Sequence, residues 1–330
     1  MSRPVTLLKR SIHRMVAHVV GFALRPGATY DPCNFKIWER RGYHITPVHF
    51  YSPIPDTREL DEAYPPPSSL VGIDLRTEFQ LKLLEEVFPQ YAIEYNAFPS
   101  QPADPTAFYL NNDAFNGIDP HVYYCFVRHF QPKVIIEVGS GYSTLLGFQA
   151  IQVNNTSARL IVIDPWPRDF TSDFLRVNGR RIEYIPAKVQ EVAIDLFLQL
   201  QENDILFIDG SHVVRTGSDV CFLFQEVIPR LSEGVIVHFH DIFLPFDYPK
   251  EWVVEKHVFW TEQYMLQAYL TENSHAEVLF AAHFISSEYP DMVRTAFPNA
   301  LWWGGGSFWI RKSDCSSPPD MQPNLSALWG

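Results

Sequence analysis

The sequence predicts an α/β protein built on a doubly wound, seven-stranded and mostly parallel sheet. Two observations lead to this prediction. From about residue 119 onwards, short β-branched and aromatic runs alternate with segments of helical spacing, and strands that alternate with helices form parallel sheets. The last two runs are separated by a Gly/Pro/aromatic stretch without a good helix. We therefore expect these two runs to pair as an antiparallel hairpin.

The elements follow one another in a regular order along the chain. The expected strands are the apolar runs at 134–138, 160–164, 182–185, 205–209, 235–240, 277–283 and 307–311. The expected helices lie at 121–130, 143–152, 190–200, 218–228 and 261–271. Ligands of a parallel sheet bind beyond the carboxyl ends of its strands, so polar residues at those ends are the first candidates for a functional site.

The pattern divides the 330 residues into three parts. Residues 1–118 form an irregular extension, residues 119–312 form the α/β domain, and residues 313–330 form a loose tail. Within the extension, residues 31–118 are rich in proline and aromatic side chains, and only 77–88 has clear helical spacing. Long irregular segments in a compact chain commonly serve as lids, so we expect a lid or a substrate wall here.

The first 30 residues differ in charge from the rest of the chain. They contain five basic residues and no acidic one. Charges interrupt the apolar stretch and no small-residue cleavage site follows, so we predict no signal peptide. A basic amphipathic helix of this kind could rest on an anionic membrane surface, or pack on the domain or on a second subunit. The apolar residues at helical spacing are Leu8, Ile12, Met15, Val19 and Phe22.

Composition excludes several classes of protein. The net charge of −12 argues against a nucleic-acid binder, because such proteins need a basic surface. Cys33, Cys125, Cys221 and Cys315 are scattered, which argues against a zinc site or a disulfide framework and fits the reducing cytoplasm. No apolar run reaches the ~18 residues that span a bilayer.

A glycine turn is the most informative motif. The strand 134–138 contains Glu137 and runs into Gly139 and Gly141, and glycine lets the backbone approach a ligand closely. Asp164 closes the next strand, where an acid can bind the two hydroxyls of a ribose. A dinucleotide fingerprint would need a third glycine where Thr144 stands. The pair of motifs indicates a nucleoside-bearing cofactor.

These features resemble the class I S-adenosylmethionine-dependent methyltransferases over about residues 119–312. The segments 49–55, 209–212, 238–245 and 305–310 also resemble a bacterial methyltransferase family of poorly defined substrate. The resemblance implies a Rossmann-like sheet of order 3-2-1-4-5-7-6 and S-adenosylmethionine as cofactor. The residues it assigns to the cofactor are Glu137, Gly139, Ser140, Gly141, Ser143, Asp164, Trp166, Val189, Gln190 and Asp209.

A second group of candidates lies at the ends of the fourth and fifth strands. Metal-dependent catechol-type O-methyltransferases are similar here, with an Asp at the first position and Asp-Asn at the second, where this chain has His240-Asp241. The likeness implies a site of Asp209, His240 and Asp241 for Mg²⁺, Mn²⁺ or iron. His212 stands where that family has its catalytic lysine and is the expected general base, so the catalytic residues would be His212, Asp209 and His240. For His238 a core position is the better expectation.

The expected activity is methyl transfer to a small-molecule hydroxyl of a sugar, a phenol or a natural product. Tyr248, Trp252 and Gln263 are candidates for the acceptor pocket, and residues 111–113 for part of a lid. Three other classes stay open: a metal-dependent oxygenase on the same fold, an NAD-dependent enzyme, and a non-catalytic protein that kept the cofactor fold. A homo-oligomer is also open.

Overall fold

The computed structural model describes residues 3–24, 31–102, 104, 106–154, 157–179 and 181–313. The predicted tail after residue 313 and Arg25 lie outside these residues. The chain divides into two compact units, residues 1–65 and 66–330. Residues 66–118, which the sequence pattern grouped with the extension, therefore belong to the same compact unit as the sheet.

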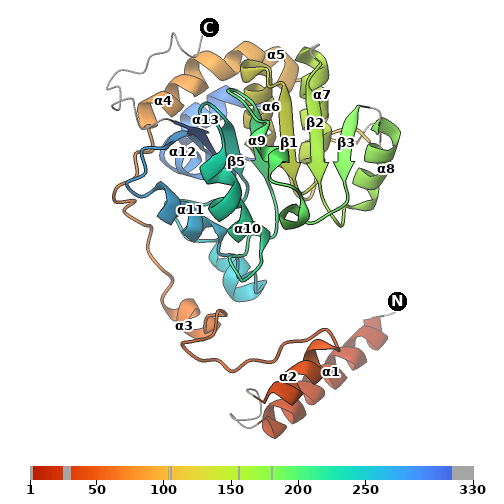
Figure 1. Ribbon diagram of the computed structural model, residues 1–330. Helices are drawn as coiled ribbons and strands as arrows, with labels where there is room; N and C mark the ends of the chain where they lie inside the picture. The colour runs from red at the N-terminus through yellow and green to blue at the C-terminus, as the bar shows by residue number, and fades with distance from the viewer. Residues whose placement is uncertain are drawn as a thin grey trace. The chain divides into compact units, whose positions relative to one another are not determined.

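Seven strands form one sheet in the larger unit, in the predicted order β3-β2-β1-β4-β5-β7-β6. Strands β1 to β5 pair in parallel, and β7 pairs antiparallel with both β5 and β6 (Figure 1). The predicted fold class is confirmed. The strands are β1 (Val134–Val138), β2 (Arg159–Ile163), β3 (Ile182–Ile185), β4 (Ile205–Ile208), β5 (Ile236–Phe239), β6 (Ala276–Ala281) and β7 (Phe308–Lys312).

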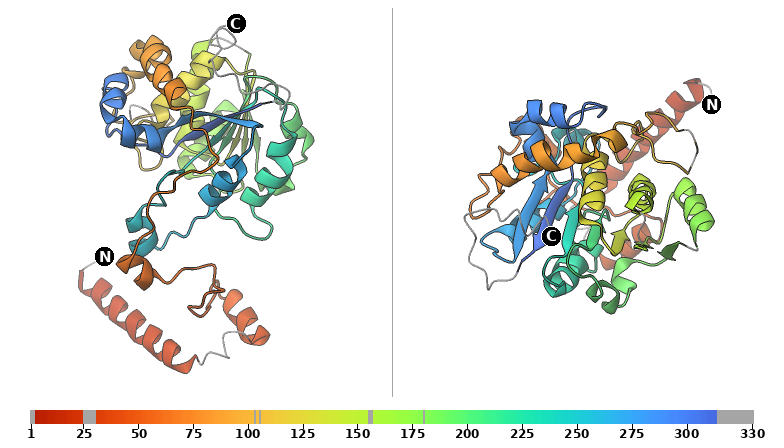
Figure 2. Two further views of the ribbon diagram at one scale, coloured as in Figure 1. Left: turned by 90° about the vertical axis from the view of Figure 1, so that its left-hand side faces the viewer. Right: turned by 90° about the horizontal axis from the view of Figure 1, so that it is seen from above.

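Helices cover both faces of this sheet, as the two views of Figure 2 show. The α-helices of the unit are α4 (Thr77–Lys82), α5 (Ala92–Tyr95), α6 (Asp119–Phe130), α7 (Tyr142–Asn154), α8 (Asp169–Asn178), α9 (Asp195–Leu198), α10 (Asp219–Phe222), α11 (Glu262–Leu270), α12 (Ala282–Glu288) and α13 (Pro290–Ala296). Short π and 3₁₀ turns are η1 (Leu83–Val87), η2 (Phe88–Tyr91), η3 (Val189–Glu191), η4 (Leu223–Val227), η5 (Ile228–Arg230) and η6 (Glu251–Glu255).

The core lies in two layers because side chains of a strand alternate between the two faces of a sheet. Ile135 and Phe207 pack on one face with α6, α7 and η1. Ile136 and Leu206 pack on the other face with α10, η4 and α11. This double burial explains why the strands are continuous apolar runs rather than alternating ones.

Two expectations about helices were wrong, and one helix was not predicted. The segment 190–200 forms only η3 and the short α9, because Val192 between them is extended. Helix α8 had no prediction; it buries Phe174 and Leu175. Between β6 and β7 the chain forms α12 and α13, although no good helix was expected there, and the two strands still pair antiparallel.

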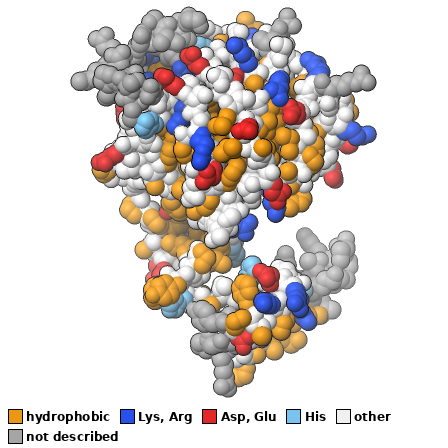
Figure 3. All heavy atoms as spheres, in the orientation of Figure 1, with side chains coloured by type: hydrophobic (Ala, Val, Ile, Leu, Met, Phe, Trp, Pro, Cys, Tyr) orange, Lys and Arg blue, Asp and Glu red, His pale blue; other side chains and the backbone are white. Residues whose placement is uncertain are grey.

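The N-terminal unit holds α1 (Arg3–Ala23), α2 (Pro32–Glu39) and α3 (Thr57–Glu62). The predicted N-terminal helix is confirmed as α1. Across residues 11–24 and 31–65, no residue is buried. Figure 3 shows apolar side chains at the surface of this unit, beside basic ones. In the described part of the chain, none of the helices has both the length and the apolar character that crossing a membrane requires.

Candidate active site at the carboxyl ends of the strands

The glycine turn after β1 fits between the ends of β2 and β4. Gly139 has a φ of +89°, and a Cβ on it would lie 2.0 Å from the carbonyl oxygen of Asp209. Its N–H donates to the carbonyl oxygen of Ile163 at 3.0 Å. The left-handed conformation and the close contact both require glycine. The turn is therefore held against its two neighbouring strands.

The other side of this turn is open. A Cβ on Gly141 would meet no heavy atom within 4 Å, so a ligand can approach the backbone at this point. The Gly141 N–H donates to Thr144 Oγ1 at 3.0 Å. Ser140 Oγ donates to Asp164 Oδ2 at 2.6 Å, which joins the two motifs found in the sequence.

Glu137 lies fully buried beneath the turn. Ser143 Oγ donates to Glu137 Oε1 at 2.5 Å, while Oε2 has no partner among the described residues. Burial raises the pKa of Glu137 to about 8, against the hydrogen bonds from Ser143 and Thr144. A carboxyl with one unpaired oxygen and a raised pKa is suited to receive a cationic ligand group.

Asp164 and the loop after β3 form the far side of this opening. Asp164 Oδ1 accepts the Trp166 N–H at 2.8 Å, and the Trp166 side chain is 76% exposed. Val189 is buried. Gln190 Nε2 donates to the carbonyl oxygen of Gly217 at 3.1 Å, and Gln190 Oε1 is buried without a partner among the described residues.

The segment before α6 lies against this edge of the sheet. Tyr109 and Tyr142 share a hydrogen bond between their hydroxyls at 2.9 Å, and Asp113 forms an ion pair with Arg168 at 2.9 Å. Among the described residues, the amide of Asn112 bonds members of its own loop: Tyr109, Ala114 and Phe115. The part of the expected lid that reaches a neighbouring element is therefore Asp113.

A cluster of three ionisable side chains stands beyond β4 and β5. It consists of Asp209, His212 and Asp241, whose ligand atoms lie within 4.8 Å of one another. His212 Nε2 lies 3.2 Å from Asp209 Oδ1 and 3.8 Å from Asp241 Oδ2. The two predicted carboxylates come together as expected, but the imidazole beside them is His212 and not His240.

Two of these residues have an unusual backbone conformation. His212 has a φ of +58° and Asp241 a φ of +56°, in the left-handed region that costs free energy for residues other than glycine. Strained residues of this kind gather at functional sites. The conformation turns both side chains toward Asp209, and no sequence pattern indicated it.

Helix α11 holds His212 in place. Glu262 is fully buried, and its Oε2 shares a hydrogen bond with His212 Nδ1 at 2.9 Å. The carbonyl oxygen of His212 accepts the N–H groups of Thr261 and Glu262 at 2.8 and 3.0 Å, and the Trp260 ring lies 4.3 Å from the imidazole. No sequence pattern pointed to Glu262, because it lies 50 residues from His212 in the chain.

Electrostatics favours the ionised forms of Asp209 and His212. Burial raises the pKa of Asp209, but His240 and His212 outweigh it and lower this pKa to about 2. Burial opposes protonation of His212, but hydrogen bonds with Asp209 and Glu262 raise its pKa well above the usual value. Both ring nitrogens of His212 face carboxylates, and the general-base role expected from the sequence stays a prediction.

His238 and His240 lie deeper in the sheet. His238 is fully buried, shares a hydrogen bond with Ser307 Oγ at 3.0 Å and stacks on Phe207, which confirms the expected core position. His240 is 5% exposed and lies against the Phe115 ring, with centroids 5.3 Å apart. Its Nδ1 has no partner among the described residues.

Two of the expected acceptor residues hold the loop after β5 instead. Gln263 is buried and bonds the N–H of Phe243 and the carbonyl oxygen of Phe246. Tyr248 is buried, and its hydroxyl accepts the Gln263 N–H at 3.1 Å. Trp252 packs on the rings of Phe243 and Trp260, so of the three it alone keeps partial exposure near the cluster.

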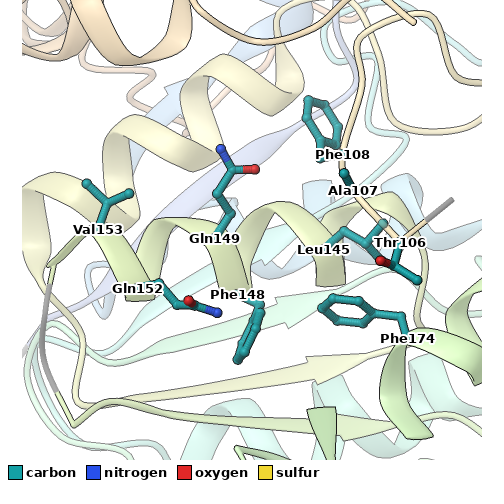
Figure 4. Close-up of a pocket in the computed structure, with 9 residues that line it drawn as sticks. All are labelled: Thr106, Ala107, Phe108, Leu145, Phe148, Gln149, Gln152, Val153 and Phe174. Carbon is teal, nitrogen blue, oxygen red and sulfur yellow. The ribbon is translucent and has the colours of Figure 1, made fainter. Parts of the chain in front are cut away.

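A cavity of about 350 Å³ opens elsewhere, between α7, α8 and the segment 106–108 (Figure 4). Phe108, Phe148 and Phe174 line it together with the amide groups of Gln149 and Gln152. None of the residues predicted for the cofactor or the metal belongs to its lining. The cavity is therefore separate from the candidate active site.

Comparisons with known proteins indicate the family of the chain. A family described as a methyltransferase domain matches residues 136–242, which contain the glycine turn and the cluster. An uncharacterized protein of Archaeoglobus fulgidus is 32% identical over 214 residues, which cover 60% of this chain and 90% of the relative. The family match favours neither of the two other enzyme classes, a nicotinamide-dependent enzyme and a metal-dependent oxygenase.

Two solved structures are also similar. The methyltransferase PaMTH1 of Podospora anserina, bound to SAH, has 16% identity and a TM-score of 0.39, and the match covers 72% of this chain and 94% of that one. A methyltransferase of Geobacter sulfurreducens has 16% identity and a TM-score of 0.36, with 79% and 99% covered. With the family match and the confirmed strand order, the chain belongs to the class I S-adenosylmethionine-dependent methyltransferases.

Proposed function

We propose that this methyltransferase acts on a hydroxyl of a small molecule (a sugar, a phenol or a natural product), and that a divalent cation held by Asp209, His212 and Asp241 assists it. The convergence of three metal-ligating groups beside the glycine turn is the observation that supports this proposal. The free thiols of Cys33, Cys125 and Cys221 fit a cytoplasmic location, which we also propose.

The donor set fits a divalent cation. If Glu262 accepts a proton from His212 Nδ1, then Nε2 presents a lone pair toward Asp209 and Asp241. In that state Nε2 is an acceptor that lies 3.2 Å from the Asp209 carboxylate and 3.8 Å from the Asp241 carboxylate. These acceptors repel one another unless a proton or a cation lies between them. Two carboxylates and one imidazole suit Mg²⁺, Mn²⁺ or Fe²⁺. The Glu262–His212 pair is the kind of carboxylate–histidine support that orients metal ligands.

The cofactor residues follow from the opening around Gly141. We assign Asp164 to the ribose hydroxyls and the buried carboxyl of Glu137 to the ammonium end of the methionine part. The unpartnered Gln190 Oε1 is an acceptor for the adenine amino group, and the exposed Trp166 can cover the adenine ring. Gly139, Ser140 and Ser143 shape this opening, with Val189 packed beneath the loop.

In the proposed reaction the acceptor oxygen attacks the sulfonium methyl in line. The new O–C bond forms as the S–C bond breaks, the sulfur keeps the electron pair of the broken bond, and the hydroxyl proton passes to solvent water. The chain itself orients the two reactants, which supplies much of the catalysis for such a transfer. A bound cation would supply Lewis acidity that lowers the pKa of the hydroxyl.

The metal part is tested by calorimetric titration of the apoprotein with Mn²⁺. We expect saturable binding of Mn²⁺ by the unmodified chain. In Asp241→Asn the affinity should fall at least ~10-fold, because the variant loses one of the two carboxylate charges of the cluster. Asparagine also tolerates the left-handed backbone of position 241. Asp247→Asn, which alters a partly buried carboxylate outside the cluster, is the matched control and should bind normally. Equal binding by both variants would remove the cluster from metal binding.

The cofactor part is tested by titration with S-adenosylmethionine. Asp164→Ala loses charge-assisted hydrogen bonds to the ribose, and we expect roughly 10- to 100-fold weaker binding. Asp169→Ala is the control. It alters an exposed acid at the first position of α8, and this variant should bind S-adenosylmethionine as the unmodified chain does. If Asp164→Ala kept full affinity, the ribose assignment would fail while the fold and family remained intact.

A further inference from the structure

Helix α1 exposes an apolar face over residues 12–22 that none of the described residues of its own unit covers. Ile12, Met15, Val16 and Val19 are 46%, 62%, 51% and 63% exposed, and Phe22 is 92% exposed. Their spacing of three or four residues places them on one side of the helix. Apolar side chains gathered in this way mark an interaction surface.

The rest of the N-terminal unit has the same character. Phe50 and Tyr51 are each 81% exposed, Tyr43 is 67% exposed, and Val48 is 66% exposed. Across the described residues 11–24 and 31–65, no side chain is buried. A segment that buries none of its apolar residues is stabilised by what it binds, since burial of apolar surface is the main favourable contribution to folding.

The charges on α1 distinguish between possible occupants. The first 30 residues carry five basic groups and no acidic one, while the whole chain has a net charge of −12. Arg14 is exposed and, by helical spacing, lies opposite Ile12 and Val16. A second copy of α1 would bring only like charges, with no acid in either helix to pair with them. An anionic lipid surface complements these charges.

We propose that α1 docks in the plane of an anionic membrane surface, with Val16, Val19 and Phe22 inserted among the lipids and the basic side chains at the headgroups. This is the arrangement of interfacial amphipathic helices that do not cross the bilayer. Tyr51 and Tyr43 add aromatic side chains of the type enriched at the membrane interface. The methyltransferase would then act beside the membrane, and its acceptor would be a molecule found there.

The test is sedimentation of the full chain with phosphatidylcholine vesicles, with and without phosphatidylserine. We expect binding only when phosphatidylserine is present, and weaker binding as salt is raised. Arg14→Gln should weaken binding to the anionic vesicles about fivefold, since each basic residue near such a surface contributes about 1 kcal/mol to the binding free energy. An absence of binding to the anionic vesicles would overturn the proposal.

A matched pair of variants separates insertion from charge. Val19→Glu and Ala17→Glu introduce the same charge at exposed positions of one helix, but only Val19 lies on the apolar face. Val19→Glu should weaken binding at least ~10-fold more than Ala17→Glu, because burial of a valine-sized side chain is lost as well. Equal weakening would overturn insertion. If the chain forms a dimer that only Val19→Glu dissociates, a second copy is the occupant and the proposal is wrong.

Discussion

The two units differ most in what they bury. The unit that contains the sheet encloses Phe207, Tyr123 and Trp309 without any exposure, and its seven strands are paired through one continuous sheet. The N-terminal unit has three helices, and no side chain is buried across its residues 11–24 and 31–65. The first unit has the core that independent folding needs, whereas these residues of the second unit contribute to no core. The cofactor and metal candidates all lie in the first.

The largest effect we expect comes from removing a core side chain of the larger unit, compared with the same change at an exposed position of the N-terminal unit. Phe207→Ala empties a fully buried position between Tyr123 and His238 and should lower the free energy of unfolding by about 3–5 kcal/mol. Phe50→Ala, at a position 81% exposed, should change it by less than about 0.5 kcal/mol. Denaturant unfolding measures both. A similar decrease in the free energy of unfolding for both variants would contradict the difference in burial between the two units.

A second effect concerns the buried carboxyl of Glu137. Its pKa is about 8 in the folded protein against 4.5 when unperturbed, so the unfolded state ionises first as pH rises. The neutral Glu137 carboxyl therefore makes its full contribution to stability below about pH 4.5. This contribution decreases as pH rises, and the loss is complete above about pH 8. The total is on the order of a few kcal/mol.

Glu137→Gln should remove this part of the pH dependence, which unfolding curves recorded across the same window would reveal. Glu62→Gln changes an exposed carboxyl of the N-terminal unit and serves as the control, whose curve should overlay that of the unmodified chain. Parallel curves for Glu137→Gln and the unmodified protein would show that Glu137 is not held in its neutral form.

A smaller effect should follow from loosening His212. Glu262→Gln keeps the shape of the side chain but removes the charge that faces His212 Nδ1 at 2.9 Å. Loss of such a supporting carboxylate typically weakens metal binding 10- to 100-fold, and Mn²⁺ titration would measure it. Glu251→Gln, an exposed acid of η6, should have no effect. If the two variants bound Mn²⁺ alike, Glu262 would have no positioning role.

The sheet and its strand order could be predicted because buried strands leave continuous apolar runs, and Gly139 marks the end of the first. The helices between β6 and β7 could not, because α12 and α13 have seven residues each and lie among proline and aromatic residues. Asp209 and Asp241 were identified because each lies within two residues of the end of a strand.

The choice between His212 and His240 could not be made from the sequence. It depends on the left-handed backbone at His212 and Asp241, which local residue types do not reveal. Glu262 was missed for a related reason, since only the packing of α11 against the loop after β4 brings it to His212. Strand ends identify where a site lies, and tertiary contacts decide which side chains enter it.

The most direct test of the division between the units is calorimetric titration of S-adenosylmethionine into a chain shortened to residues 66–330. Since Glu137, Asp164 and Gln190 all lie in this unit, we expect the shortened chain to fold and to bind the cofactor with the same affinity as the full chain, within about twofold, given that interactions at independent sites are additive. Loss of cofactor binding by a shortened chain that remains folded would contradict the account, because it would show that the N-terminal unit completes the cofactor site.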